Sequence, residues 1–180
     1  MSRSNSIPIL FACLVAAATA GLANAQESII TDRPDFTESA FSVEPGAAQI
    51  EGGFTLAIHG SRQAFSLPET LVRYGLKDGL ELRIGVPDYV DLAFASGLGD
   101  LAVGAKLEVD NLLEEWDVAA VGRLVLPTGD EGISGETVGA QVILVGGTGL
   151  NDRWSLGTQA SLGFLGDGAE NNLELGATAV

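Results

Sequence analysis

Residues 70–86, TLVRYGLKDGLELRIGV, decide the fold. Apolar side chains stand at every second position, at Val72, Tyr74 and Leu76 and again from Leu80 to Val86, while the positions between them are charged or glycine. A period of two predicts two half-buried β-strands. The three residues between them, Lys77-Asp78-Gly79, predict a hairpin loop with Gly79 in the left-handed conformation. That loop would pair Leu76 with Leu80 and Tyr74 with Leu82, so that all four lie on one face.

The same alternation recurs along the chain and predicts eight strands. It is clean in most segments, weaker at 117–126, and hidden at 137–146, which is nearly apolar throughout. Most segments run about ten residues, the length that a tilted strand needs to cross a bilayer. The predicted strands are residues 48–59, 65–76, 80–86, 100–109, 117–126, 137–146, 154–164 and 172–180.

The connections between these strands alternate in length. Three are short or of moderate length, at residues 77–79, 110–116 and 151–153, and those at 60–64, 87–99, 127–136 and 166–171 are on the whole longer. Outer-membrane barrels have short periplasmic turns and long extracellular loops. We therefore expect an all-β, antiparallel up-and-down transmembrane β-barrel, with about eight strands present and its first strand starting from the periplasmic side. A soluble β-sandwich, which also buries one face of each strand, is the alternative.

The first 25 residues predict a secretory signal peptide. One positive charge at Arg3 precedes an apolar run, and Ala23-Asn24-Ala25 supplies a small-residue cleavage site before Gln26. Cys13 is the only cysteine and would leave with the signal, so the mature chain would have no disulfide. We expect three parts: a signal peptide at 1–25, a periplasmic segment at 26–46 and the barrel at 47–180.

Charge and hydropathy limit the partners and the membrane-spanning structures that the chain can have. The chain has 24 acidic and 9 basic residues and a formal net charge of −15, which argues against nucleic acid as a partner. Hydrophobic residues make up 46%, yet no stretch beyond the signal has the roughly 20 consecutive apolar residues of a spanning helix. Apolar surface is therefore dispersed over strands.

Several stretches resemble the outer-membrane transporters grouped as the MetA pathway of phenol degradation family. The most specific is residues 30–39, ITDRPDFTES, followed by matches at residues 43–54, 67–83, 97–101, 126–129 and 151–157. The resemblance implies a barrel that passes aromatic or other small apolar compounds. Such proteins usually continue for several more strands, so we expect the barrel to be incomplete at the C-terminus, which leaves its closure open because unpaired backbone groups are costly in lipid.

Charged residues share the polar parity on successive strands. They predict a charge ladder inside the barrel, formed by Arg73, Arg83, Lys106, Arg123, Glu69, Glu81, Asp100 and Glu108. The ladder would either set the polarity of a pathway or form a salt-bridged network that fills the lumen. In the predicted register Arg73 faces Arg83, which requires carboxylates beside them. Asp32, Arg33, Asp35 and Glu38 precede the first strand and would form either a plug in the lumen or a loose periplasmic tail.

We find no pattern for a cofactor, a metal or a catalytic centre, and we expect a protein that is not an enzyme. His59, the only histidine, lies near Ser61, Ser66 and Glu69, and an envelope hydrolase built on these residues is the weakest of three hypotheses. Acidic loop residues could bind divalent cations at the lipopolysaccharide surface, or only keep the loops soluble: Asp88, Asp91, Asp130, Glu131, Glu136, Asp167 and Glu170.

The leading hypothesis is an outer-membrane channel for passive uptake of small solutes, aromatic or apolar compounds among them. The second is a structural or interaction barrel with a filled lumen and no transport. Either protein would reside in the outer membrane, with lipid, lipopolysaccharide and the barrel assembly machinery as partners, and the channel would also bind its small-molecule solute.

Overall fold

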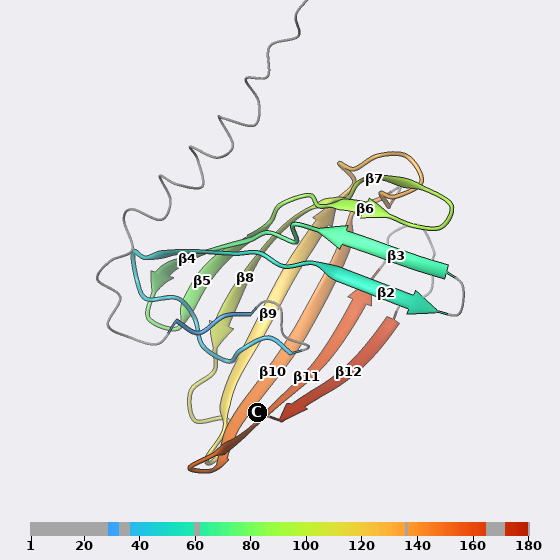
Figure 1. Ribbon diagram of the computed structural model, residues 1–180. Coiled ribbons are helices and arrows are strands. Elements are labelled where there is room, and N and C mark those ends of the chain that lie inside the picture. The colour runs from blue at the N-terminus through green and yellow to red at the C-terminus, as the bar shows by residue number, and fades with distance from the viewer. Residues whose placement is uncertain (1–28, 33–36, 60–61, 136, 165–171, 180) are drawn as a thin grey trace, which may run out of the picture. The chain divides into compact units, whose positions relative to one another are not determined.

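A computed structural model describes residues 29–32, 37–59, 62–135, 137–164 and 172–179, in which the regular elements are all β-strands (Figure 1). The predicted signal peptide and its cleavage site lie outside these residues. Within them no helix is long and apolar enough to cross a membrane. The chain divides at residue 30, and all of its described strands lie in the unit Thr31–Val180. Its strands are β1 (Ala48–Glu51), β2 (Thr55–His59), β3 (Arg62–Leu67), β4 (Leu71–Lys77), β5 (Leu80–Gly85), β6 (Tyr89–Asp91), β7 (Ser96–Leu98), β8 (Leu101–Glu108), β9 (Asp117–Leu126), β10 (Gly139–Asn151), β11 (Trp154–Phe164) and β12 (Asn172–Ala179).

Eight strands form one antiparallel sheet in the order β1-β4-β5-β8-β9-β10-β11-β12. These strands fall within or around the eight predicted segments, so the all-β, antiparallel part of the prediction is confirmed. In Figure 1 the strands β4, β5 and β8 to β12 of this sheet lie side by side in chain order. Within the described part of the chain, no pairing of β1 with β12 closes the sheet. A closed barrel is therefore not seen, and the transmembrane barrel, whose closure the sequence left open, stays a prediction.

The first two predicted strands, 48–59 and 65–76, are each divided in two. The chain leaves the large sheet at Gly52 and Gly53, and returns to it after Pro68. Proline has no amide hydrogen and glycine weakens a strand, which explains why both interruptions fall there. The parts that lie outside the large sheet, β2 and β3, pair with β6 and β7 of the predicted 87–99 loop. Together they form a second sheet of order β2-β3-β6-β7. The predicted unbroken strands at 48–59 and 65–76 are therefore wrong.

The hairpin of β4 and β5 is close to its predicted form. Tyr74 lies opposite Leu82 and Arg73 opposite Arg83, as predicted, and Gly79 has a φ of 70°. A register shift between Gly75 and Lys77 places Lys77, rather than Leu76, opposite Leu80. The predicted pairing of Leu76 with Leu80 is therefore wrong, because a bulge takes up one residue of β4.

The two faces of the large sheet differ sharply in chemistry. One face, here called the outer face, leaves large apolar side chains exposed on almost every strand. Ile50 on β1 is 71% exposed and Leu175 on β12 is 75% exposed. The inner face instead buries charged residues, with Arg73 at 1% and both Glu81 and Lys106 at 0% exposure. A soluble protein shows the reverse distribution. The exposed outer set includes Ile50, Tyr74, Leu82, Ile84, Leu107, Leu124, Val142, Leu144, Leu162, Phe164, Leu173 and Leu175.

Residues 31–32 and 37–44, here called the inner segment, contact the inner face of the sheet. The backbone of this segment passes so close to Gly75 that a Cβ there would collide with the carbonyl oxygens of Val43 and Glu44. Just beyond the segment, the amide of Gly46 donates to the Gly75 carbonyl at 2.8 Å. Glycine is therefore required at position 75 because another backbone lies against it.

We expect Gly75→Ala to lower the free energy of unfolding by about 1–3 kcal/mol, the usual cost of forcing extra atoms into a filled site. Chemical denaturation of the refolded protein measures this. The matched control is Gly147→Ala, another strand glycine of the inner face, where an added Cβ meets nothing within 4 Å. Equal stabilities for the two variants would contradict the packing of the inner segment on β4.

Candidate functional site

Three cations from three neighbouring strands meet on the inner face. Arg73 lies on β4, Arg83 lies opposite it on β5, and Lys106 lies on β8, which pairs with β5. All three side chains are buried. Buried like charges repel one another unless carboxylates lie between them. The surrounding anions therefore decide whether this arrangement is stable.

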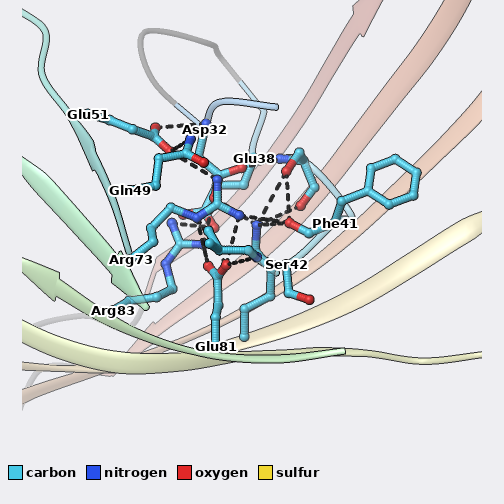
Figure 2. A network of polar contacts seen from close by, with 12 residues as sticks. Asp32, Glu38, Phe41, Ser42, Gln49, Glu51, Arg73, Glu81 and Arg83 are labelled. Atoms are coloured by element: carbon cyan, nitrogen blue, oxygen red, sulfur yellow. Dashed lines mark hydrogen bonds and ion pairs between the residues drawn. The ribbon is translucent and has the colours of Figure 1, made fainter. Parts of the chain in front are cut away.

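Asp32 of the inner segment supplies the shared anion. Its Oδ2 atom lies 2.6 Å from Nη1 of Arg83, 2.7 Å from Nζ of Lys106 and 3.5 Å from Nη1 of Arg73. Figure 2 shows the two arginines and Asp32 converging in one network of polar contacts. One carboxylate thus contacts all three cations, although it comes from outside the strands.

Two glutamates on the strands complete the cluster. Glu81 of β5 accepts hydrogen bonds from Nε and Nη2 of Arg73, both at 2.9 Å, and lies 3.1 Å from Arg83. Glu51 of β1 accepts from Nη1 of Arg73 at 2.9 Å and from the Asp32 amide at 2.8 Å. Fork-shaped pairing of guanidinium with carboxylate is among the stronger polar contacts in proteins. With Glu38, which lies 3.2 Å from Arg83, these residues form the charged cluster: Asp32, Glu38, Glu51, Arg73, Glu81, Arg83 and Lys106.

The backbone of the inner segment also takes part. Nζ of Lys106 donates to the carbonyl of Ser39 at 2.9 Å, and Nη2 of Arg73 donates to the carbonyl of Phe41 at 2.8 Å. In the opposite direction, the amide of Val43 donates to Glu81 at 2.8 Å. Figure 2 shows the ring of Phe41 pointing away from the charges while its carbonyl faces them. Backbone groups therefore satisfy the cations that carboxylates leave partly unmatched.

Further contacts join the inner segment to strands β8 and β11. Ser42 donates through its amide and hydroxyl to Glu108 at the end of β8. The amide of Glu38 donates to Gln159 of β11 at 2.9 Å. Asp32 and Glu38, two of the residues before the first strand, are bound to the sheet and do not form a loose tail. The alternative of a plug in a lumen stays a prediction, because no closed barrel is seen. Arg33 and Asp35 lie outside the described residues.

The carboxyl of Asp32 keeps its charge despite burial. Loss of hydration by burial raises the pKa of Asp32, but the positive charges of Lys106, Arg83 and Arg73 outweigh it and hold the pKa well below its ordinary value. Asp32 is therefore an anion at neutral pH, which matches its three cationic neighbours.

The predicted charge ladder does not form one continuous row. Arg73, Arg83, Lys106 and Glu81 come together in the cluster, whereas Glu108 bonds Ser42 and Arg123 donates to Gln141 on β10. Glu69 lies outside the cluster, in the connection from β3 to β4, with a φ of 45°.

Asp100, also predicted for the ladder, organises a loop instead. Its carboxylate accepts from the amides of Thr128, Gly129 and Gly135 and from the hydroxyl of Ser134. Partial burial raises the pKa of Asp100, but the Ser134 hydroxyl and then the three amides lower it by more. Asp100 therefore holds residues 128–135 in place rather than lining a row of charges.

Two cavities of different size touch residues of the inner face. One of about 740 Å³ is lined by Ala40, Phe41, Glu108 and the connection from β8 to β9. The other, of about 110 Å³, is lined by Arg83 and Arg123 together with the carboxylates of Glu69, Asp88 and Asp100. The inner segment contributes to the larger cavity, and the charged cluster borders the smaller one through Arg83.

Among the described residues, no group of three or more His, Cys, Asp or Glu side chains is placed to hold a metal ion. The His59 side chain and Ser61 lie outside the described residues, while Ser66 donates to Asp88 at 2.7 Å. Among the acidic loop residues, Asp130 accepts from the amide of Leu98, and Glu136, Asp167 and Glu170 lie outside the described residues.

Comparison with known proteins assigns the family. The family model described as "Putative MetA-pathway of phenol degradation" matches residues 31–179, which is nearly all of the described unit. The chain belongs to this family. The resemblance drawn from residues 30–39 and the later motifs is thereby confirmed. The matched range begins just before Asp32, so the inner segment is part of what this protein shares with its family.

A curated protein also matches part of the chain. The UDP-3-O-acylglucosamine N-acyltransferase of Caulobacter sp. (strain K31) is 32% identical over 123 residues, which cover 68% of this chain and 34% of that enzyme. The chain therefore spans about a third of the length of this curated relative. No solved structure matches the chain at a significant level.

We expect Asp32→Asn to lower the free energy of unfolding by about 3 kcal/mol or more at pH 7, because it leaves buried cations without their shared anion. The control is Asp152→Asn, at an exposed turn. The pKa of Asp32 is depressed in the folded state, so its stabilisation is complete above its ordinary pKa of 3.8 and declines as the pH falls below that value. Chemical denaturation from pH 7 to pH 3 should therefore show the difference in stability between the unmodified protein and Asp32→Asn becoming smaller. A difference that stays constant over this range would contradict the role of the Asp32 carboxylate as the shared anion.

Proposed function

We propose that this protein is an outer-membrane β-barrel component that passes small solutes across the bilayer. The observation that carries the proposal is the inverted chemistry of the large sheet, with charges buried on the inner face and apolar side chains exposed on the outer face. Strands that contact lipid need this arrangement, because the bilayer takes the place of a protein core. Strands β9, β10 and β11, of 10, 13 and 11 residues, reach the roughly 9–11 residues that a tilted strand needs to cross a bilayer.

Family membership and the predicted signal peptide support the same location. Export through a signal peptide followed by antiparallel strands fits the bacterial envelope. In this proposal the outer face contacts lipid, the loops meet lipopolysaccharide, and the barrel assembly machinery inserts the chain. The family description links the protein to phenol degradation, which favours small aromatic compounds as solutes.

A filled barrel without transport is the second candidate, and the charged cluster favours it. The inner segment covers Arg73, Glu81 and Lys106 so completely that each side chain is at most 1% exposed. A permanent network of this kind would stabilise a barrel without providing a path. Acyl transfer is not proposed, because the matching acyltransferase shares only a third of its own length with this chain.

We expect Leu144→Arg on the outer face to lower stability in a bilayer by about 2–4 kcal/mol, the cost of placing arginine in its apolar centre. Leu144 is 55% exposed, so the same change in a soluble sandwich would be nearly neutral. Urea unfolding in lipid vesicles measures the difference. Leu112→Arg, at an equally exposed residue in the connection from β8 to β9, is the control. Equal effects of the two substitutions would contradict the lipid-facing role of the outer face.

Conductance measurements distinguish a channel from a filled barrel without transport. Refolded full-length protein in planar bilayers should give discrete current steps, and aromatic solutes in the bath should reduce them. Gly75→Ala, which displaces the inner segment, should increase the conductance or the open time, while Gly147→Ala should leave both unchanged. A folded and inserted protein that stays silent in all three forms would favour the filled barrel over the channel.

A further inference from the structure

The inner segment supplies every hydrogen bond and ion pair of the Lys106 side chain within the described residues. The partners are the carboxylate of Asp32, the carbonyl and hydroxyl of Ser39, and the carbonyl of Phe41. Lys106 is fully buried. If the segment moved away, a buried ammonium group would lose all of these partners together.

Arg83 depends on the same segment to a lesser degree. Its guanidinium contacts Asp32 and Glu38 of the segment and only Glu81 of the strands. Arg73, by contrast, keeps the strand carboxylates Glu51 and Glu81. Within the cluster the strands carry three cations and two carboxylates, so they alone hold one unmatched positive charge.

A buried charge without a partner is strongly destabilising. The strands therefore require an anion next to Lys106 and Arg83, which either the inner segment or another anion can supply. Water alone replaces a carboxylate poorly at such a position, whereas another carboxylate reproduces the same charge-assisted hydrogen bonds. The smaller cavity gives a small anion an approach, since Arg83 and Arg123 line it. The larger cavity does not serve this role, because its lining is acidic, with Glu108 and four carboxylates of the connection from β8 to β9 and the start of β9.

We propose that Lys106 and Arg83 form a binding site for a small organic carboxylate solute, and that Asp32 occupies this site in the absence of the solute. The solute carboxylate takes the position of Asp32 Oδ2, accepts hydrogen bonds from Nζ of Lys106 and Nη1 of Arg83, and releases the inner segment from the sheet. This inference rests on the proposed transport function and names the solute class and the residues that select it.

Benzoate binding to the refolded full chain tests the site, with benzamide as the uncharged compound of the same shape. We expect Asp32→Asn to bind benzoate about tenfold more tightly than the unmodified protein, because the internal competitor no longer occupies the site. Lys106→Gln should bind it at least tenfold more weakly, and Lys106→Arg should retain binding. Isothermal titration measures all four proteins. No gain in Asp32→Asn, or equal binding of benzamide, would overturn the proposal.

Release of the inner segment can be measured directly, in a second experiment in which no charged residue is substituted. Thr37 is buried against β11, where its hydroxyl oxygen would lie 3.0 Å from a Cβ at Gly157. In a Cys13→Ser background, Thr37→Cys carries the only thiol. Benzoate should raise its rate of maleimide labelling several-fold, and benzamide should not. Leu112→Cys, at an exposed position, should show no change with either compound. A Thr37→Cys rate that benzoate leaves unchanged would overturn the proposal, whatever the charge variants do.

The results of these experiments distinguish failure of the carboxylate site from failure of the proposed channel. A protein that conducts in bilayers but shows no benzoate effect would keep the channel and lose the carboxylate site. A protein that binds benzoate and exposes position 37 in detergent, yet never inserts into bilayers, would keep the site and lose the channel.

Discussion

The contact of Asp32 with three cations is the interaction on which the inner face depends. Arg73, Arg83 and Lys106 come from adjacent strands, and their burial together is tolerable only because an anion reaches all of them. That anion arrives on a segment with no regular secondary structure, which ties its position to the charges rather than to strand pairing. The sheet and the segment therefore stabilise each other, since neither satisfies its polar groups alone.

Alternation along the chain predicted the large sheet well, because one face is apolar on every strand. The hairpin at Asp78 and Gly79 and the strand β11 follow their predicted positions closely. Prediction failed where local chemistry interrupts the alternation, at Gly52, Gly53 and Pro68. The second sheet was missed because β6 and β7 have three residues each, too few for a period of two to be recognised.

The charged cluster could be predicted only in part. Parity placed Arg73, Arg83, Lys106 and Glu81 on one face, and the like charges facing one another implied nearby carboxylates. Glu51 was overlooked as a partner although its parity was right, and Asp100 could not be told from a loop residue. The carbonyls of Ser39 and Phe41 leave no trace in side-chain chemistry, so sequence patterns carry no signal for them.

Asp32 lies ahead of every described strand, which has a consequence for the order in which the charges are made. If the protein is exported from its N-terminus, as proposed above, this carboxylate crosses first, and Lys106 follows 74 residues later. During insertion, β4, β5 and β8 would each bring a cation to the inner face as they pair, with their counter-ion already translocated. Under that proposal the inner segment would act as an internal template for the charged strands, because it is synthesised before them.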